Sequence, residues 1–593
     1  METTTKNENI IDEIERPRTA EQLKGRLIVA LLCVGLSAIA VVPFFFMGRS
    51  EDGAGATGLR MPTTHDMFLH YDQMRSFYEG LRSGEVYPRW EEDTNRGFGA
   101  PTTSYYPPGV YYLTAMFYAA TKDWIIALLG THLLMMVMSA VAIYWYARRV
   151  MGRVGAVAAM AAYVMGPYHL IDQYQRGAIA ELMGFVYMPM MLMCAEELME
   201  KKRGMKSGVW AVVGLAMIYG AFVWTHPPTA YQFSLGFGMY VVMKGVMERE
   251  WRGLVKVGAG LVMGLGIAGA YIIPAALEQN MIHKEYITTT WPYHNTYVFV
   301  HELFNYNIFV DFFRCIDSLW IFGCAIIIVA GSALLLFNRQ ADSSDSRLKQ
   351  RVILWMTLGC LASFMMHRFS KPIGRLIPNI EIGVFTWRML SITTLVVSLL
   401  AGACAHTAFQ AIKERQRKAL IVCGSLCLLV LIGGAMFSAL FVVAPTRFAS
   451  VFVPEEEHLN PAMIPITAPG DLEELPDDVP PAELAEDNGE VVIEKWNPEH
   501  RIIKVELQDA DQLWIRAFNF PGWTATVDGQ PAPITSGEEL GDIEIDLEAG
   551  THEVRLDFLD TPIRRRAERI TIASFGLLLI MAVVPLFVPA RKR

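Results

Sequence analysis

Residues 62–109 read PTTHDMFLHYDQMRSFYEGLRSGEVYPRWEEDTNRGFGAPTTSYYPPG, a polar stretch that is dense in aromatic side chains and follows the first long apolar run. It opens with His65 and Asp66, and His70 and Asp72 follow closely. Long ordered loops are uncommon in compact proteins and tend to carry function. The alternative is a solvated connector whose charges face water, and composition alone leaves both interpretations open.

The composition around this stretch is that of a membrane protein. The chain has 593 residues, of which 53% are hydrophobic and 19% charged, with a mean hydropathy of +0.29. Repeated apolar runs of about 18 or more residues predict a polytopic α-helical membrane protein. The net charge is −9, with the acid concentrated in one late segment, so no nucleic-acid partner is expected. The eight cysteines show no CxxC or CxxH spacing, so no disulfide framework or cysteine metal motif is predicted.

Twelve apolar runs predict about twelve transmembrane helices. The runs are 27–47, 124–147, 154–170, 179–198, 208–225, 228–246, 254–276, 317–337, 350–367, 386–409, 419–444 and 570–589. The run at 109–121 is too short, because at about 1.5 Å per residue it falls short of a hydrocarbon core of roughly 30 Å. We expect an interfacial or re-entrant helix there.

Charge distribution supports this topology. With a cytoplasmic N-terminus and 109–121 not crossing, the basic clusters near Arg148, Lys201 and Lys413 all fall inside, as the positive-inside bias requires. We therefore expect a multi-pass protein of the inner (plasma) membrane, with the first run kept as an uncleaved span. The predicted outer loops are 48–123, 168–180, 225–228, 277–316 and 368–385.

The character of the chain changes after the eleventh run. Residues 454–490 are rich in Pro, Glu and Asp and predict an extended, poorly packed linker. Residues 491–560 alternate apolar and polar side chains, with Asp528-Gly529 as a hairpin turn, and predict a small antiparallel β-sandwich on the outer face. The predicted domains are 1–26 (cytoplasmic leader), 27–445 (transmembrane domain), 446–490 (linker), 491–562 (sandwich) and 570–593 (last helix and basic tail).

Aromatic side chains of the predicted sandwich have two interpretations. Trp514, Trp523 and Phe520 could stack on sugar rings. Aromatic residues of a small sandwich more often form its core and rim, which is the interpretation we favour.

The first outer loop offers candidate catalytic groups close to the membrane. A partly desolvated carboxylate at Asp66 suits a general base or a metal ligand. On a helix, Asp66 and His70 share a face at i, i+4. The mixed spacing of His65, Asp66, His70 and Asp72 is a weak metal motif. A divalent cation is the one cofactor that the pattern leaves open.

Charged residues also occur at the mouths of later spans, where an ionisable group is costly unless it is paired or used. The second outer loop and the span after it carry Asp172, Arg176 and Glu181, for which a structural Arg176–Glu181 ion pair is the alternative to a functional role. His226 stands before two prolines, where it either caps a span or belongs to the site.

Four cations on the predicted outer side run against the positive-inside bias. They are Arg368, Lys371, Arg375 and Arg388. Cations held there indicate an anionic partner such as a lipid phosphate, or side chains that snorkel to the interface. For Arg388 the expected partner is either a phosphate or Glu381.

The motifs HD…YPRW…GFGAPTTSYYPPG, YQRGAIAE and WTHPPTA resemble a bacterial branch of the GT-C superfamily of integral-membrane glycosyltransferases. Members of this branch are labelled as membrane proteins related to 6-pyruvoyl-tetrahydropterin synthase. The similarity covers roughly 60–450. FPGWTATVDG and EAGTHEVRLDF resemble the C-terminal sandwich of related bacterial membrane proteins. The resemblance implies a GT-C-like transmembrane domain.

The resemblance also implies a function. A sugar would move from a polyprenyl-phosphate donor to a glycan, lipid or protein acceptor on the outer face. The alternative is a non-catalytic transporter or scaffold for lipid-linked saccharides in cell-envelope polysaccharide assembly. No pair of runs shows the Gly/Pro-broken inverted repeats that are typical of secondary transporters.

Residue roles follow from the same resemblance. Asp66 matches the first-loop catalytic acid, with His65 and Asp72 beside it, and the second-loop acid is Asp172 or Glu181. Arg176 and Arg388 match the phosphate-binding cations, and His226 and Asp172 are grouped with them. Trp90, Tyr105 and Tyr106 are expected to position sugar or lipid. The paired acids of the superfamily are replaced here by His65-Asp66, so the resemblance leaves metal dependence undecided.

Overall fold

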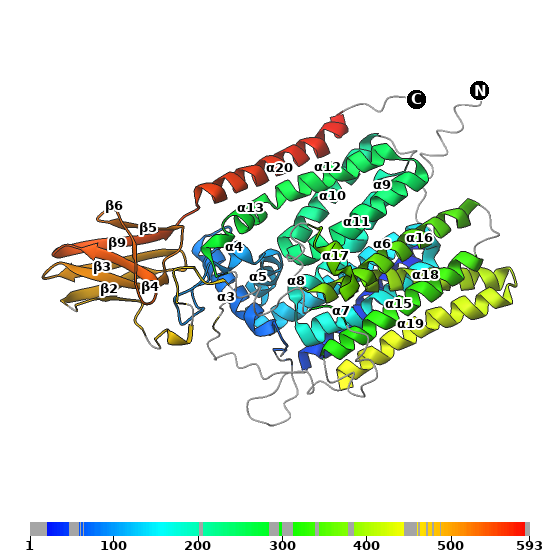
Figure 1. Ribbon diagram of the computed structural model, residues 1–593, viewed down its shortest axis with the longest axis horizontal. Coiled ribbons are helices and arrows are strands. Elements are labelled where there is room, and N and C mark those ends of the chain that lie inside the picture. Colours follow the sequence, from blue (N-terminus) through cyan, green and yellow to red (C-terminus); the bar gives the residue numbers. More distant parts are fainter. Residues whose placement is uncertain are drawn as a thin grey trace.

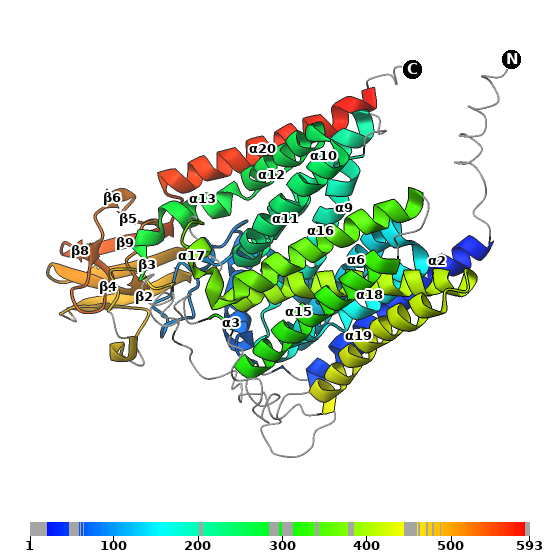
Figure 2. The ribbon, with the colours of Figure 1, turned by 45° about the vertical axis from the view of Figure 1, so that its right-hand side comes forward.

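A computed structural model describes most of the chain. The described residues are 20–46, 59, 61–62, 64–200, 205–283, 296–298, 312–337, 343–377, 385–443, 459, 463–469, 472–476, 479–486 and 488–587. They form a helical bundle with a two-sheet β domain at one end (Figure 1). The N-terminal end of α2 and the C-terminal end of α20 lie on the side away from the β domain (Figure 2).

The helices follow the predicted apolar runs closely. The longer ones are α2 (Ala20–Val41), α3 (Met67–Ser83), α5 (Gly109–Thr121), α6 (Trp124–Val164), α9 (Gly184–Leu198), α10 (Met205–Thr225), α11 (Pro227–Glu248), α12 (Trp251–Ile267), α13 (Gly269–Leu277), α15 (Phe312–Phe337), α16 (Ser343–Met366), α18 (Leu390–Lys413), α19 (Arg417–Val443) and α20 (Pro562–Phe587). The short ones are η1 (Val42–Phe46), α4 (Thr102–Tyr105), α7 (Pro167–Ile171), η2 (Asp172–Arg176), α8 (Ile179–Leu182), η3 (Gln279–Met281), η6 (Arg368–Ser370), α17 (Lys371–Gly374), η8 (Thr386–Met389) and η11 (Leu472–Glu474).

The length and composition of the helices support the predicted spans in part. In the described part of the chain, seven helices are long and apolar enough to cross a membrane, or eight if the bent pair α12 and α13 is one span. Two predicted runs fall within one of these candidates, Trp124–Arg176, because α6 consists of two helices that meet at a kink at the non-helical Gly152 (φ 74°). Helices α11, α16 and α20 occupy three further predicted runs, but polar and charged residues interrupt their apolar ones.

The predicted short helix between the first loop and α6 is present as α5. It starts directly after Pro107 and Pro108, as expected of residues that favour a helix start. Its thirteen residues pack on α6, where Oγ1 of Thr131 lies 3.3 Å from Oγ1 of Thr114. It is not among the spans that length and composition support in the described residues.

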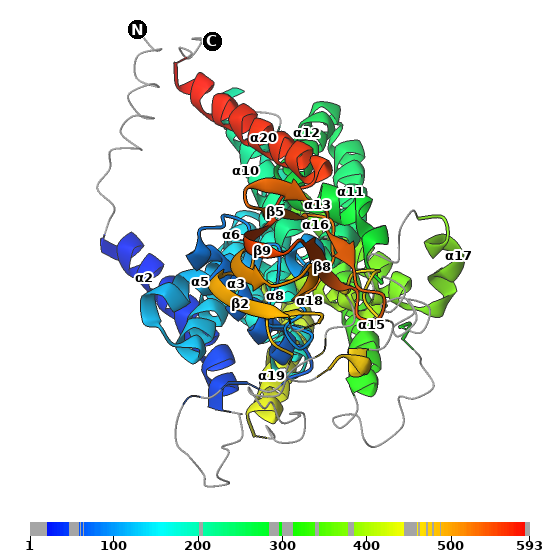
Figure 3. The same cartoon turned by 90° about the vertical axis from the view of Figure 1, so that its left-hand side faces the viewer.

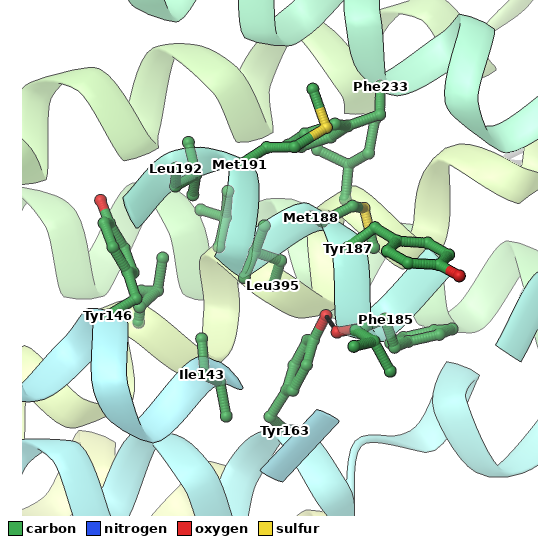
Figure 4. Close-up of a cluster of buried hydrophobic side chains, with 14 of the residues drawn as sticks. Ile143, Tyr146, Tyr163, Phe185, Tyr187, Met188, Met191, Leu192, Phe233 and Leu395 are labelled. Carbon is green, nitrogen blue, oxygen red and sulfur yellow. Dashed lines mark hydrogen bonds between the residues drawn. The ribbon is translucent and has the colours of Figure 1, made fainter. Parts of the chain in front are cut away.

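Helix α9 is the centre of the bundle. The apolar segment Ile179–Leu198, which comprises α8 and α9, is almost entirely buried, and α9 packs among α6, α10, α11 and α18. Figure 4 shows Phe185, Met188 and Leu192 of this helix among Tyr163 of α6, Phe233 of α11 and Leu395 of α18. The hydroxyl of Tyr163 donates to the backbone oxygen of Phe185 over 2.9 Å. This packing fixes the N-terminal end of α9. The short helix α8, which carries Glu181, comes directly before it in the chain.

The predicted antiparallel sandwich is confirmed. Its strands are β1 (Ala482–Leu484), β2 (Gly489–Trp496), β3 (His500–Leu507), β4 (Asp511–Phe518), β5 (Trp523–Val527), β6 (Gln530–Ala532), β7 (Thr535–Ser536), β8 (Asp542–Leu547) and β9 (Gly550–Phe558). One sheet has the order β1-β4-β8-β7 and the other β2-β3-β9-β5-β6. Asp528 and Gly529 both have positive φ (52° and 77°) and form the predicted hairpin turn. Trp523 and Phe520 are buried in the core, as expected.

One part of the predicted linker is instead part of the sandwich. Strand β1 pairs with β4, although it lies inside the stretch expected to be extended and poorly packed. Ile464, Leu472 and Leu475 are buried in the same core. These apolar residues lie far apart in an acidic stretch, so the sequence showed no alternating strand pattern there.

Candidate active site

Asp66 stands at the start of α3 and is hydrogen-bonded to the segment that was predicted to form the second outer loop. Its backbone N–H donates to the carbonyl oxygen of Arg176 over 2.9 Å, and that of His65 donates to Gln175 over 3.1 Å. Thr64 supports the turn, because its Oγ1 accepts from the N–H of Met67 at 3.2 Å. The acidic motif of the first loop is therefore held against a segment far away in the sequence.

That segment is a π-helical turn. Residues Asp172–Arg176 form η2, and Gly177 ends it in the left-handed region with φ 64°. A Cβ at Gly177 would lie 2.0 Å from Oγ1 of Thr64, so only glycine lets the two loops approach this closely. Single π-helical turns within helices occur frequently at functional sites.

Four side chains from the turn and its neighbours form a buried ion cluster. Nη1 of Arg176 donates to Oδ1 of Asp172 (2.7 Å) and to Oε2 of Glu181 (2.5 Å). Nε of Arg388, from η8, donates to the same Glu181 oxygen over 3.1 Å. Asp172 and Glu181 are fully buried, and both cations are nearly so. Two acids and two cations compensate each other, so removal of one member leaves a buried unpaired charge.

Tyr168 of α7 completes the cluster. Its hydroxyl donates to Oε1 of Glu181 over 2.9 Å and accepts from Nη1 of Arg176 at 3.3 Å. Sequence reasoning did not single out this residue, although it opens the predicted second outer loop. Oδ2 of Asp172 has no hydrogen-bond partner among the described residues, which is rare for a buried carboxylate.

Arg388 has a partner that the sequence did not indicate. The sequence indicated either Glu381 or a phosphate, which both stay predictions, and in the structure Arg388 pairs with Glu181. Glu381 lies outside the described residues. Spacing along the chain could not reveal this pair, because the two residues come from different ends of the domain. The Arg176–Glu181 ion pair is present, as the structural alternative required.

His70 and Tyr106 lie on the α3 side of the cluster. The ring nitrogen Nδ1 of His70 is 3.1 Å from the hydroxyl of Tyr111, and the Tyr106 ring centre is 5.6 Å from that of His70. Burial lowers the pKa of His70 to about 4, although the nearby Asp66 charge opposes this shift. His70 is therefore neutral at physiological pH, so it can form hydrogen bonds but contributes no charge to the site.

His226 caps α11 beside the ion cluster. Its Nδ1 accepts from the N–H of Thr229 at 3.4 Å and lies 2.8 Å from the hydroxyl of that residue. The charges of Glu181 and Arg388 both act on the buried imidazole. The structure thus brings His226 to the ion cluster, and His226 also caps α11.

The remaining predicted site residues lie elsewhere. Trp90 is 2% exposed and packs on Trp523 and Phe558 of the sandwich, so its ring is not available to a substrate. The hydroxyl of Tyr105 donates to the backbone oxygen of Glu278 over 2.8 Å. Both side chains join the first loop to other elements. The burial of Trp90 argues against its expected role in substrate positioning, whereas the half-buried Tyr105 keeps that role as a prediction.

His65 and Asp72 flank the site without joining the ion cluster. His65 is exposed at the start of α3. Asp72 lies further along α3, where its charge acts on the neighbouring Tyr71 and on Glu91 of the first loop. No group of three or more His, Cys, Asp or Glu side chains in the described ranges could hold a metal ion. A divalent cation at Asp66 remains a prediction.

An apolar groove of about 520 Å³ reaches the cluster at Tyr168. Helices α6, α7, α15, α18 and α19 form its walls. Its lining is almost entirely aliphatic and aromatic, with Leu319, Phe322, Leu390, Val397 and Phe437 among the residues. Tyr168 therefore belongs both to an apolar groove and to a charged site.

The sequence of the chain is similar to a known protein family. A model of a membrane-protein family, the 6-pyruvoyl-tetrahydropterin synthase related domain, matches residues 103–442, more than half of the chain. The chain belongs to this family. The family resemblance predicted from the YPRW, YQRGAIAE and WTHPPTA motifs is confirmed. No curated protein matches the chain.

Solved structures show a distant likeness to this family member. The apo oligosaccharyltransferase of Archaeoglobus fulgidus has a TM-score of 0.42 and 10% identity, covering 71% of this chain and 56% of that one. The same enzyme, AglB, with an inhibitory peptide and a dolichol-phosphate has a TM-score of 0.42 and 10% identity, covering 72% and 56%. ArnT of Cupriavidus metallidurans, bound to undecaprenyl phosphate, has a TM-score of 0.37 and 12% identity, covering 71% and 77%. The chain spans little more than half of the archaeal enzyme, and scores below 0.5 carry no argument about function.

Proposed function

We propose that this family member is a membrane glycosyltransferase of the GT-C type. It moves a sugar from a polyprenyl-phosphate donor to an acceptor on the side of the membrane that carries the sandwich. The observation that carries this proposal is the double position of Tyr168. Its ring lines the apolar groove, and its hydroxyl bonds to Glu181 and Arg176.

The groove and the cluster match the two parts of such a donor. An isoprenoid chain is apolar and flexible, and a groove of about 520 Å³ between helices can hold several of its units. The phosphate would then lie at the mouth of the groove, beside Arg176 and Arg388. Every side-chain hydrogen bond that Arg176 makes to the described residues uses Nη1, which leaves the other guanidinium nitrogens to a phosphate.

The chemistry assigns a role to each charged group. Asp66 takes the proton from the acceptor hydroxyl as that oxygen attacks the anomeric carbon, and the bond from this carbon to the phosphate oxygen breaks. The lipid phosphate leaves with its negative charge, which the two guanidinium groups stabilise. The Asp66 carboxylate forms no hydrogen bond to the described residues, so it is open to an acceptor. Glu181 and Asp172 hold the guanidinium groups in position.

A transfer assay tests this function against its alternative. Purified protein in detergent is mixed with an undecaprenyl-phosphate sugar and a panel of glycan, lipid and peptide acceptors, without any gradient. Release of undecaprenyl phosphate with a glycosylated acceptor is the expected result. Tight donor binding without release in every combination would contradict transfer and would favour a scaffold for lipid-linked saccharides.

A further inference from the structure

Arg388 belongs to the ion cluster. The other three of the four predicted outer cations have no role in the proposed active site. Arg368 belongs to η6, Lys371 to α17, and Arg375 directly follows α17. None of the three forms an ion pair with a carboxylate of the described residues. Three neighbouring cations that have no acidic partner in the described part of the chain create a local positive field there.

Large apolar side chains alternate with these cations and face outward. Phe369 is 70% exposed, Ile373 47% and Leu376 82%. In the view from the sandwich side, α17 stands at the rim of the helical bundle (Figure 3). Exposed apolar residues interleaved with cations are typical of segments that lie in a membrane interface.

A second apolar groove opens below this segment, between α15 and α16. It has a volume of about 360 Å³ and is lined by Trp320, Cys324, Ile328, Phe364, His367 and Phe369, among others. Trp320 is fixed there, because its ring stacks on His367 at 5.3 Å and its indole N–H donates to the backbone oxygen of Ser363 over 2.8 Å. Arg368 lies in sequence between two of the lining residues.

We propose that this groove and its three cations bind an anionic glycerophospholipid. One acyl chain lies in the groove against Trp320, and the phosphate group lies on Arg368, Lys371 and Arg375. The site is separate from the proposed donor groove, since the two share no lining residue. It goes beyond the transferase proposal, because it holds a bilayer lipid whether or not the protein transfers sugar. The interfacial cations predict a preference for an anionic head group over a zwitterionic one.

Tryptophan quenching tests the site directly. The protein is reconstituted in phosphatidylcholine vesicles that contain either brominated phosphatidylglycerol or brominated phosphatidylcholine at equal fraction. Bromine on an acyl chain next to Trp320 quenches its fluorescence, so we expect stronger quenching by phosphatidylglycerol. Trp320→Phe should remove the difference between the two lipids.

Charge variants identify the head-group contacts. Each cation contributes about a fivefold preference near an anionic surface, so Arg368→Gln, Lys371→Gln and Arg375→Gln together should abolish the preference. The matched control changes three exposed sandwich cations, Lys495, Lys504 and Arg555, to Gln and should keep it. Equal quenching by both lipids in the unmodified protein would overturn the proposal. So would a preference that persists in the first triple variant, or one that undecaprenyl phosphate removes at equimolar concentration.

Discussion

The backbone N–H of Asp66 donates a hydrogen bond of 2.9 Å to the carbonyl oxygen of Arg176, a residue more than a hundred positions later in the chain. This bond sets the proposed base beside the proposed phosphate-binding cation. Since a displacement of about 1 Å can cost a hundredfold in rate, the docking of these two loops is a condition for activity.

Gly177→Ala tests the docking. The added methyl group would collide with Oγ1 of Thr64, and φ 64° is itself unfavourable for alanine. We expect transfer to fall at least tenfold, together with a lower unfolding temperature in detergent. Gly84→Ala is the matched control, because Gly84 also has positive φ (108°) but its Cβ would meet open space. Equal losses in both variants would show that backbone strain, and not loop docking, limits activity.

Asp66→Asn tests the proposed base. The substitution is nearly isosteric and removes the proton acceptor, and a general base typically contributes about a hundred- to ten-thousandfold in rate. We expect transfer to fall by that amount while the unfolding temperature changes little. Asp93→Asn is the control, because Asp93 is exposed and its one ion pair among the described residues is with the exposed Arg75. Activity of Asp66→Asn within threefold of the unmodified enzyme would exclude Asp66 as the base.

Glu181 and Arg388 should be strongly coupled. Glu181→Gln leaves two buried cations with one acid, and breaking a buried pair in this way costs about 3–5 kcal/mol. Arg388→Gln should also destabilise the fold, and the double variant should recover part of the loss. Thermal unfolding of all four proteins in detergent measures this coupling. Additive losses would mean that the 3.1 Å contact contributes no stability.

Arg388→Lys separates stability from donor binding. Lysine keeps the charge next to Glu181 but loses the planar pair of donors that matches a phosphate. We therefore expect nearly unchanged thermal stability and a weaker use of the polyprenyl-phosphate donor, seen as a higher KM. An unchanged KM would limit Arg388 to a structural partner of Glu181.

Glu499 should make the junction between the first loop and the sandwich sensitive to pH. Burial raises the pKa of Glu499 to about 7, although the backbone N–H groups of Arg89 and Trp90 oppose this shift. The folded protein therefore holds a proton that the unfolded chain releases near pH 4.5, so the stability from this group falls as pH rises from about 4.5 to 7.

Glu499→Gln keeps an oxygen acceptor for these N–H groups and cannot titrate. We expect a flatter profile of unfolding temperature between pH 5 and pH 7.5, roughly the window set by the raised pKa. Glu494→Gln, on the same sheet, removes an exposed ion pair with Lys504 and should leave the profile unchanged. Identical profiles in the unmodified protein and Glu499→Gln would contradict a buried proton at this position.

The predicted topology places the sandwich and the first loop on the outer face. In a cysteine-free background, single cysteines at Val86 and Asp509 should react with an impermeant reagent in intact spheroplasts, while one at Glu414 should not. All three positions are exposed in the structure, so reactivity reports the side of the membrane and not burial. Labelling at Glu414 but not at Val86 would reverse the orientation.

Local patterns in the sequence were sufficient to predict the helices, the strands and several candidate site residues. Apolar runs predicted helices correctly, because a backbone in lipid must satisfy its hydrogen bonds internally. Alternation predicted the strands of the sandwich, since successive strand side chains face opposite sides. Asp172, Arg176 and Glu181 stood out because charged residues at the ends of spans are costly without a partner.

The tertiary structure alone decided which of these residues meet. The contact of Glu181 with Arg388, the burial of Trp90 against Trp523, and the bond from Asp66 to Arg176 all join distant segments. Sequence spacing describes only neighbours on the same helix or strand, such as residues at i and i+4. Contacts between segments depend on how the helices and the sandwich pack, and one glycine at position 177 determines whether the two loops of the site can approach.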